Sequence, residues 1–188
     1  MKIGIYPGSF DPMHLGHIQI INKILEEKIV DKVLVVPTGN YWDKNITTSI
    51  EDRINMVKLI SSDSILVEER DNQIKATYDF LQIKQLEYKK AELWLIIGGD
   101  NVERIHKWIN YMRLIEYPFI VVGREGFDKK YIEKKFKNLN KRNYVVLNMP
   151  NIDISSTYIR ENINNKEKIE SMLDSKIYQY IQDHKLYK

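Results

Sequence analysis

Short apolar runs alternate along this 188-residue chain with longer segments that have the period of an amphipathic helix. The runs are nearly continuous, as in Val33-Leu34-Val35-Val36 and Leu95-Ile96-Ile97, which is typical of strands buried on both faces. Because strand and helix alternate about five times, we predict an α/β fold with a doubly wound parallel sheet. The predicted strands are Lys2–Pro7, Lys32–Pro37, Ser64–Glu68, Glu92–Gly98, Pro118–Gly123 and Asn143–Met149.

The segments between these strands predict the helices that cover the sheet. A capping-box pattern, Thr48-Ser49-Ile50-Glu51, precedes one of them, and the tail from Ser155 to Lys188 also has helical period. In such sheets ligands bind at the carboxyl ends of the strands, near the point where the strand order reverses. The predicted helices are His14–Lys28, Ile50–Ile60, Ala76–Lys89, Asn101–Ile115 and Asp128–Lys137.

Composition narrows the class of protein further. The length and the absence of a linker indicate a single domain over residues 1–188. The net charge of +3 gives no argument for a nucleic-acid or membrane partner. The absence of cysteine excludes disulfides, thiolate zinc sites and cysteine catalysis. No apolar run approaches the roughly 18 residues that span a bilayer, and the first residues do not resemble a signal peptide. We therefore expect a cytoplasmic protein.

A glycine-containing turn follows the first predicted strand and leads into a helix. It reads Pro7-Gly8-Ser9-Phe10-Asp11-Pro12-Met13-His14-Leu15-Gly16-His17. Free backbone N–H groups at a helix start attract anions, and His14 and His17 share one face of that helix. Neither a dinucleotide Gly-x-Gly-x-x-Gly motif nor a Walker-type phosphate loop occurs in the chain. The pattern favours phosphate binding, although two incidental histidines, or part of a metal site with Asp11, remain alternatives.

A second group of polar residues follows the last predicted strand, in Ile154-Ser155-Ser156-Thr157-Tyr158-Ile159-Arg160. Serine and threonine are good N-caps, and Arg160 would lie about one turn into the helix, where its forked donors can hold phosphate. A plain capped helix with a surface arginine is the alternative. The position at a strand's carboxyl end favours the phosphate interpretation.

These two motifs together resemble those of the nucleotidyltransferase superfamily of the His-x-Gly-His type. Three further segments resemble bacterial nicotinate-nucleotide adenylyltransferases: Thr77-Tyr78-Asp79-Phe80-Leu81, Ile97-Gly98-Gly99-Asp100-Asn101 with the downstream Trp108, and the ending Ile177-Tyr178-Gln179-Tyr180-Ile181 with Leu186-Tyr187. The resemblance covers the chain from end to end. It implies a Rossmann-like nucleotidyltransferase fold with a helical C-terminal segment.

The same resemblance implies transfer of AMP from ATP to nicotinate mononucleotide, with Mg²⁺ accompanying ATP as cofactor and no dedicated metal ligands on the protein. Its partners are then ATP and a pyridine mononucleotide, and a homo-oligomer is possible. The implied catalytic residues are His14, His17, Lys44 and Arg160. Those implied for ATP are Gly8, Ser9, Phe10, His14, His17, Gly98, Asp100, Ile154, Ser156, Thr157 and Arg160. Those implied for the acceptor are Lys44, Thr77, Tyr78, Trp108 and Arg124.

One segment departs from the family pattern. Where the family reads Pro-Pro-His-Lys or Pro-Pro-His-Arg, this chain has Tyr41-Trp42-Asp43-Lys44, so that Asp43 replaces a histidine. Three residues also have structural interpretations. Trp108 could be a core aromatic, Asp100 could cap the following helix instead of holding a ribose hydroxyl or a metal-bound water, and Arg124 could form a surface ion pair.

Other functions remain as alternatives. A sister transferase would use nicotinamide mononucleotide, phosphopantetheine or a cytidylyl acceptor. A nucleotide-binding protein with a decayed active site is the reading that Asp43 suggests. The basic stretch Lys129–Arg142 could bind nucleic acid, but a solvated helix and loop explain it better.

Overall fold

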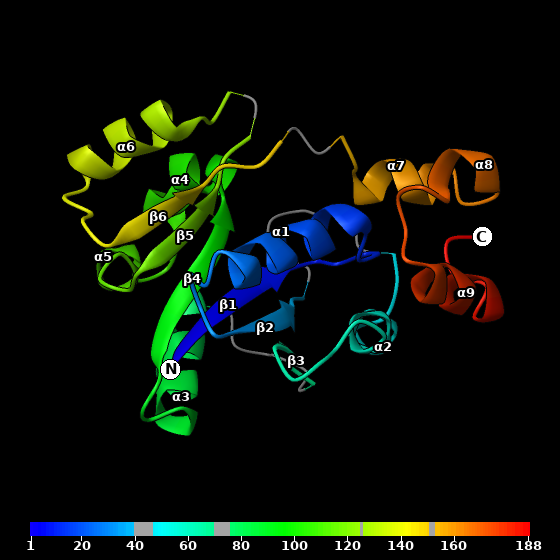
Figure 1. Ribbon diagram of the computed structural model, residues 1–188, viewed down its shortest axis with the longest axis horizontal. Coiled ribbons are helices and arrows are strands. Elements are labelled where there is room, and N and C mark those ends of the chain that lie inside the picture. Colours follow the sequence, from blue (N-terminus) through cyan, green and yellow to red (C-terminus); the bar gives the residue numbers. More distant parts are fainter. Residues whose placement is uncertain (40–46, 70–75, 125, 151–152) are drawn as a thin grey trace.

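A computed structural model describes residues 1–39, 47–69, 76–124, 126–150 and 153–188. Six strands pair in parallel in the order β3-β2-β1-β4-β5-β6 (Figure 1). Their bounds are β1 (Lys2–Gly8), β2 (Lys32–Pro37), β3 (Ile65–Val67), β4 (Glu92–Gly98), β5 (Phe119–Val122) and β6 (Tyr144–Leu147). The predicted parallel α/β sheet is confirmed.

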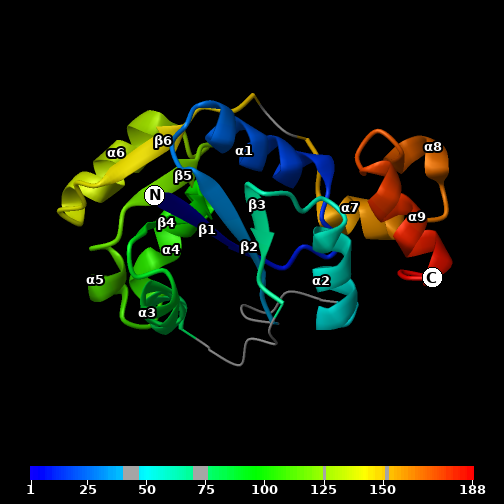
Figure 2. The same ribbon diagram turned by 60° about the horizontal axis from the view of Figure 1, so that its bottom comes forward.

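Helices cover both faces of this sheet, as the two views show (Figures 1 and 2). On one face lie α1 (Leu15–Glu26), α2 (Ile50–Lys58), α7 (Ser156–Glu161), α8 (Lys166–Ile169) and α9 (Ser175–Asp183). On the other lie α3 (Thr77–Glu87), α4 (Gly99–Arg104), the 3-10 turn η1 (Ile105–Lys107), α5 (Tyr111–Leu114) and α6 (Lys129–Asn138). The fold is therefore doubly wound, with a helical C-terminal segment, as predicted.

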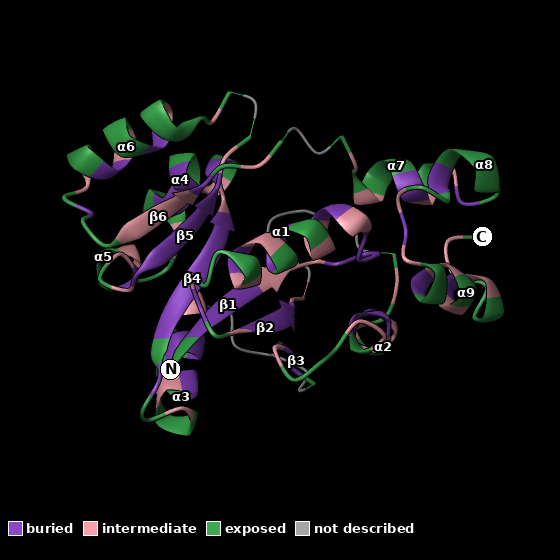
Figure 3. Ribbon diagram, viewed as in Figure 1, coloured by how far each residue is buried: buried purple, intermediate pink, exposed green. Residues whose placement is uncertain are grey.

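The sheet divides the apolar core into two clusters because successive side chains of a strand point to opposite faces. In β4, Trp94 and Ile96 belong to the cluster under α1, whereas Leu95 and Ile97 belong to the cluster under α3. Both faces of β1, β4 and β5 are covered, so these strands are buried almost throughout (Figure 3). This explains why their sequences are continuous apolar runs.

One predicted helix and the C-terminal tail are divided in the structure. The segment Asn101–Ile115, predicted as one helix, consists of α4, η1 and α5, and that prediction was wrong. Trp108 ends η1 in an extended conformation, and Asn110 has a left-handed φ of 58°. The C-terminal tail is likewise divided into α7, α8 and α9.

The strand order reverses between β1 and β4, which lie side by side although 90 residues separate the paired Lys2 and Glu92. The carboxyl ends of these two strands are Gly8 and Gly98. Both glycines belong to the segments singled out in the sequence, so the fold brings those segments together. Within the described residues, no helix has both the length and the hydropathy that crossing a membrane requires.

Candidate functional site

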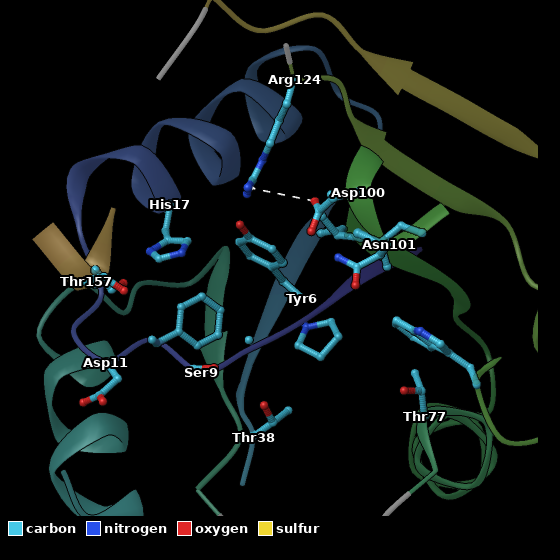
Figure 4. A pocket seen from close by; sticks show the side chains of 18 of the residues that line it. Tyr6, Ser9, Asp11, His17, Thr38, Thr77, Asp100, Asn101, Arg124 and Thr157 are labelled. Carbon is cyan, nitrogen blue, oxygen red and sulfur yellow. Dashed lines mark ion pairs between the residues drawn. The ribbon is translucent and has the colours of Figure 1, made fainter. Parts of the chain in front are cut away.

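A cavity of about 970 Å³ opens at the carboxyl ends of β1 and β4 (Figure 4). Its wall combines the turn after β1, the starts of α1, α3, α4 and α7, and the segment around Trp108. The lining residues are Tyr6, Pro7, Gly8, Ser9, Phe10, Asp11, His17, Thr38, Ala76, Thr77, Ile96, Ile97, Gly98, Asp100, Asn101, Lys107, Trp108, Ile109, Arg124, Ser156, Thr157 and Arg160.

The turn after β1 forms the floor of this cavity. Phe10, at a φ of 47°, folds its ring back over Gly8, where a Cβ would lie 2.8 Å from the ring. Only glycine allows this close approach at position 8. The buried Arg53 of α2 then holds the turn in place, because its guanidinium donates to the carbonyls of Ser9 and Thr38, at 2.6 Å each. The turn is thus fixed from beneath by a residue distant in sequence.

The two histidines of the first motif stack at the start of α1. Their ring centroids lie 3.7 Å apart, and the backbone N–H of His14 donates to His17 Nδ1 at 3.4 Å. His17 is half-buried and points into the cavity, with its ring against the edge of Phe10 (Figure 4). His14 is buried, and this burial, followed by the nearby charge of Arg124, lowers its pKa to about 4. His14 is therefore neutral at pH 7.

The start of α7 faces the turn after β1. Ser155 caps this helix by accepting from the N–H of Tyr158, and the Ser156 hydroxyl donates to the carbonyl of Pro12 at 3.0 Å. Arg160 donates from Nη1 to the carbonyl of Asp11 at 2.7 Å and from Nη2 to Thr157 Oγ1 at 3.3 Å. The two sequence motifs, about 140 residues apart, are therefore joined by hydrogen bonds around one cavity.

Charged and aromatic groups close the side of the cavity next to β4. Asp100 and Arg124 form an exposed ion pair at 3.9 Å, and the Tyr6 ring stands between this pair and His17 (Figure 4). Burial raises the pKa of the Tyr6 hydroxyl, with opposing contributions from Arg124 and Asp100. The hydroxyl is protonated at neutral pH and can donate a hydrogen bond toward the cavity.

The end of the cavity across from His17 is formed by the start of α3 (Figure 4), and Trp108 lines the same cavity. Ala76 occupies the N-cap of α3 and provides no side-chain acceptor, so the first N–H groups of this helix face the cavity beside Thr77 without a cap. Trp108 is half-buried and lines the same region. An uncapped helix start beside an aromatic ring can receive a flat anionic group.

A second cavity, of about 590 Å³, lies next to the first and shares His17, Arg124 and Ser156 with it. Its lining combines apolar side chains with residues at the carboxyl ends of β5 and β6. Its other lining residues are His14, Gly16, Ile20, Val122, Gly123, Asp128, Lys129, Val146, Asn148, Met149, Pro150, Ile154 and Ser155.

The structure brings most of the expected site residues to these two cavities. Gly8, Ser9, Phe10, His17, Gly98, Asp100, Ser156, Thr157, Arg160, Thr77, Trp108 and Arg124 line the first, and His14 and Ile154 line the second. Lys44 and Asp43 lie outside the described residues.

Tyr78 is the exception, because it is absent from the cavity lining. Its ring packs against Tyr117 at 6.3 Å and beneath Arg113. Tyr78 immediately follows Thr77 in α3, and the helical turn of about 100° per residue directs the two side chains apart. The contact of Tyr78 with an acceptor stays a prediction that the cavity lining does not support.

Sequence reasoning missed Arg53, Tyr6 and the residues at the ends of β5 and β6. Val122, Gly123 and Asn148 gave no signal except that they follow predicted strands, which is where ligands bind in this class of fold. Arg53 appeared to be an ordinary polar position of a helix. Its role depends on tertiary contacts that a sequence pattern does not contain.

Comparison with known proteins agrees with this geometry. Residues 5–162 match the cytidylyltransferase-like family. A relative from Fusobacterium nucleatum is 36% identical, with 97% of each chain covered, and one from Dehalococcoides mccartyi is 33% identical, with 100% of this chain and 97% of the relative covered. Both carry the name probable nicotinate-nucleotide adenylyltransferase.

Solved structures give the same result at the level of the fold. The Plasmodium falciparum nicotinic acid mononucleotide adenylyltransferase complexed with NaAD superimposes with a TM-score of 0.83 at 26% identity, covering 99% of this chain and 97% of that one. The same protein complexed with APC superimposes with a TM-score of 0.79 at 25% identity, covering 99% and 96%. From its family match, its full-length relatives and its fold, the chain belongs to the nicotinate-nucleotide adenylyltransferases of the cytidylyltransferase-like family.

Proposed function

We propose that this chain transfers the adenylyl group of ATP to the phosphate of nicotinate mononucleotide, giving nicotinate adenine dinucleotide and pyrophosphate in NAD biosynthesis. One observation carries the proposal. Candidate phosphate-binding groups from two distant motifs, His17 and Arg160, face one cavity, whose far end offers the open start of α3 and the Trp108 ring. The names of the relatives and of the structural neighbours support the same reaction.

The chemical demand of this reaction suits the site. An oxygen of the mononucleotide phosphate attacks the α-phosphorus of ATP, and the bond from that phosphorus to the pyrophosphate oxygen breaks. The attacking phosphate is already an oxyanion at neutral pH, so it needs neither a general base nor a covalent intermediate. The rate must then come from positioning the anions and from neutralising the charge that develops on pyrophosphate.

We assign the ATP phosphates to the region between α1 and α7. His17 would donate closest to the reacting phosphorus, and the backbone of Gly8, Ser9 and Phe10 would line the α-phosphate. Ser156, Thr157 and Arg160 would hold the β- and γ-phosphates and stabilise the departing pyrophosphate. His14 is neutral and stacks on His17, and its own contact with the ATP phosphates stays a prediction.

The second cavity suits the base of ATP, because it adjoins the phosphate region and combines apolar walls with the polar ends of β5 and β6. Ile154 would pack on one face of the base. Gly98 and Asp100, at the end of β4, would face the ribose.

The acceptor would occupy the end of the first cavity next to α3. Trp108 would stack on the pyridine ring, and the N–H groups beside Thr77 would donate hydrogen bonds to its carboxylate. Arg124, exposed and paired only loosely with Asp100, would turn toward a phosphate. We expect Lys44 to contact the same phosphate.

Mg²⁺ fits this site as a partner of ATP. Within the described part of the chain, no three His, Asp or Glu side chains come together as a ligand set; Asp11 and Asp100 both line the first cavity, and the Asp11 carboxylate already accepts from Thr47, Thr48 and Tyr187. Mg²⁺ characteristically keeps several waters and binds phosphate oxygens with one or two carboxylates, so Asp100 would contact it through water. When bound, Mg²⁺ would neutralise phosphate charge.

The deciding experiment incubates the protein with Mg-ATP and a panel of mononucleotides and measures pyrophosphate. We expect release with nicotinate mononucleotide and formation of the dinucleotide. In parallel incubations, release with phosphopantetheine as the acceptor, or with CTP in place of ATP, would identify a sister activity. Binding of ATP without release under any condition would indicate a decayed site. Oligomeric state and cytoplasmic location stay predictions.

A further inference from the structure

We propose that Tyr187 is a positioning residue for nucleotide binding: its hydroxyl fixes Asp11, and the backbone of Asp11 in turn orients the guanidinium of Arg160. The inference rests on the proposed function, because Arg160 matters here as a ligand of the ATP phosphates. It gives a role to the Leu186-Tyr187 ending, which no step of the reaction uses directly.

Asp11 is the point where four segments meet. Its side chain is 2% exposed, and its carboxylate accepts from the backbone N–H of Thr47 at 2.9 Å and from the hydroxyl of Thr48. The hydroxyl of Tyr187 donates to the same carboxylate at 2.8 Å. Buried carboxylates depend on such donors, because an unsatisfied charge costs more than the hydrogen bond itself stabilises.

The backbone of Asp11 also contacts the phosphate region. Its carbonyl accepts from Arg160 Nη1 at 2.7 Å, and the next residue, Pro12, accepts from Ser156. A shift of Asp11 therefore moves the acceptor that sets the direction of the Arg160 fork. Figure 4 shows Asp11 on the α2 side of the cavity, below Thr157 of α7.

The tail adopts an unusual backbone to make this contact. Lys185 has a φ of 52° and Tyr187 a φ of 64°, both in the left-handed region that non-glycine residues rarely occupy. Two such residues within three positions persist where surrounding contacts hold them. Leu186 and Tyr187 pack against the core cluster under α1, so the chain turns back after α9 (Figure 1). The turn delivers the Tyr187 hydroxyl to Asp11.

The same tail offers a matched control. Tyr180, on α9, donates its hydroxyl to Asp52 Oδ1 at 3.0 Å, which is also a tyrosine–aspartate bond between the C-terminal segment and the rest of the fold. Neither Tyr180 nor Asp52 lines either cavity. Tyr187→Phe and Tyr180→Phe thus each remove one hydroxyl from one carboxylate, and only the first removes it from Asp11.

The test measures the affinity of a non-hydrolysable ATP analogue by calorimetry, the KM values for ATP and mononucleotide, and the unfolding midpoint. For Tyr187→Phe we expect about a tenfold weaker analogue affinity and a matching rise in the KM for ATP, with the KM for mononucleotide within twofold. Tyr180→Phe should keep the analogue affinity and both KM values within twofold. Equal effects of the two variants on ATP would overturn the inference.

An Asp11→Asn variant supplies an independent check by a double-mutant cycle. If the hydroxyl acts through Asp11, removing it from the Asp11→Asn protein should weaken analogue binding by less than threefold. Full additivity would contradict the inference. Analogue binding needs no turnover, so a parent protein that binds ATP but forms no dinucleotide would refute the proposed function alone.

Discussion

His17 is the single residue expected to matter most to the rate, because it points into the cavity at the start of α1. His17→Ala should lower kcat by about 10²–10³, by analogy with the loss of one donor to a developing oxyanion. The measurement is steady-state kcat with saturating ATP and mononucleotide.

His106 provides the control for this substitution. It is an exposed histidine of η1 that lines neither cavity, so His106→Ala should retain the parent rate. A His17→Ala rate within threefold of the parent would exclude His17 from the reaction centre.

The buried His14 makes the stability of the folded protein depend on pH. Its pKa is about 4 in the folded protein, whereas an unfolded histidine has its usual value of 6.5. Between these two pKa values the unfolded chain binds a proton at His14 and the folded protein does not. The stability that neutral His14 contributes at pH 7 is therefore lost as the pH falls from 6.5 through 4. We expect a loss of about 3 kcal/mol from this group.

Denaturant unfolding between pH 4 and 7 checks this expectation. His14→Asn should remove most of the slope of the unfolding free energy in that window, whatever its effect at pH 7. An unchanged slope in the variant would assign the pH dependence to other groups.

Among single residues, the sequence predicted those whose type and spacing carry chemistry. His17, Ser156 and Arg160 belong to motifs at the ends of predicted strands, and each lines the first cavity. Arg53 could not be found in this way, and the family-like Leu186-Tyr187 ending did not reveal what Tyr187 contacts. Their hydrogen bonds to the turn after β1 join positions 44 and 176 residues apart, and neither contact leaves a local pattern.

At the scale of elements, the open start of α3 predicts a choice between acceptors. A carboxylate can accept from uncapped N–H groups with both oxygens, whereas a carboxamide would turn its NH₂ toward those donors and leave buried groups unpaired. Two such mismatches correspond to a preference of about 10²–10⁴ in kcat/KM for nicotinate mononucleotide over nicotinamide mononucleotide. Equal values, or a preference for the amide, would contradict this assignment of α3.

A substitution of Trp108 distinguishes the contribution of ring stacking from the choice between acid and amide. The indole contacts the pyridine ring of either acceptor in the proposed arrangement, so Trp108→Ala should lower kcat/KM for both mononucleotides. Their ratio should stay within about threefold of the parent ratio. A large change in the ratio would show that Trp108 discriminates between acid and amide.

The break between α4 and α5 shows where element prediction fails. The hydrophobic period of Asn101–Ile115 continues without a proline or glycine, so the sequence favours one helix. In the structure Asn110 takes a left-handed conformation, which asparagine tolerates better than most residues. The break places Trp108 at the cavity, and tertiary contacts outweigh helix propensity there.

At the scale of the whole molecule, Arg53 joins one helix to the ends of two neighbouring strands. It connects α2 to the carbonyls that follow β1 and β2, and it is 2% exposed. Arg53→Leu should lower the free energy of unfolding by about 3 kcal/mol, because two carbonyls lose their donor. Arg142→Leu, at an exposed position, should stay within about 0.5 kcal/mol.

Equilibrium unfolding in urea measures both variants. Arg53→Lys should fall between them, since lysine lacks the planar fork that reaches two carbonyls at once. An Arg53→Leu protein as stable as the Arg142→Leu protein would show that the turn after β1 holds its shape without this bridge.

The overall architecture was the most predictable level. Six apolar strands separated by helical segments leave few arrangements, because parallel crossovers are right-handed and the central strands must be covered on both faces. Strand bounds were less exact, and β3 spans Ile65–Val67 within the predicted Ser64–Glu68. The prediction of one domain over residues 1–188 stays a prediction.

The position of β1 in the middle of the sheet has a consequence for synthesis on the ribosome. Its first pairing partner, β2, follows after one helix, but its other partner, β4, begins 90 residues after the paired Lys2. At about 5–20 residues per second, translation takes roughly 5–20 seconds to cover that distance. Throughout that interval one edge of β1 has no strand beside it. The earliest strand made gains its second neighbour only after β2 has gained both of its own, and nascent chains stalled between β2 and residue 92 should bind chaperones through the unpaired edge of β1.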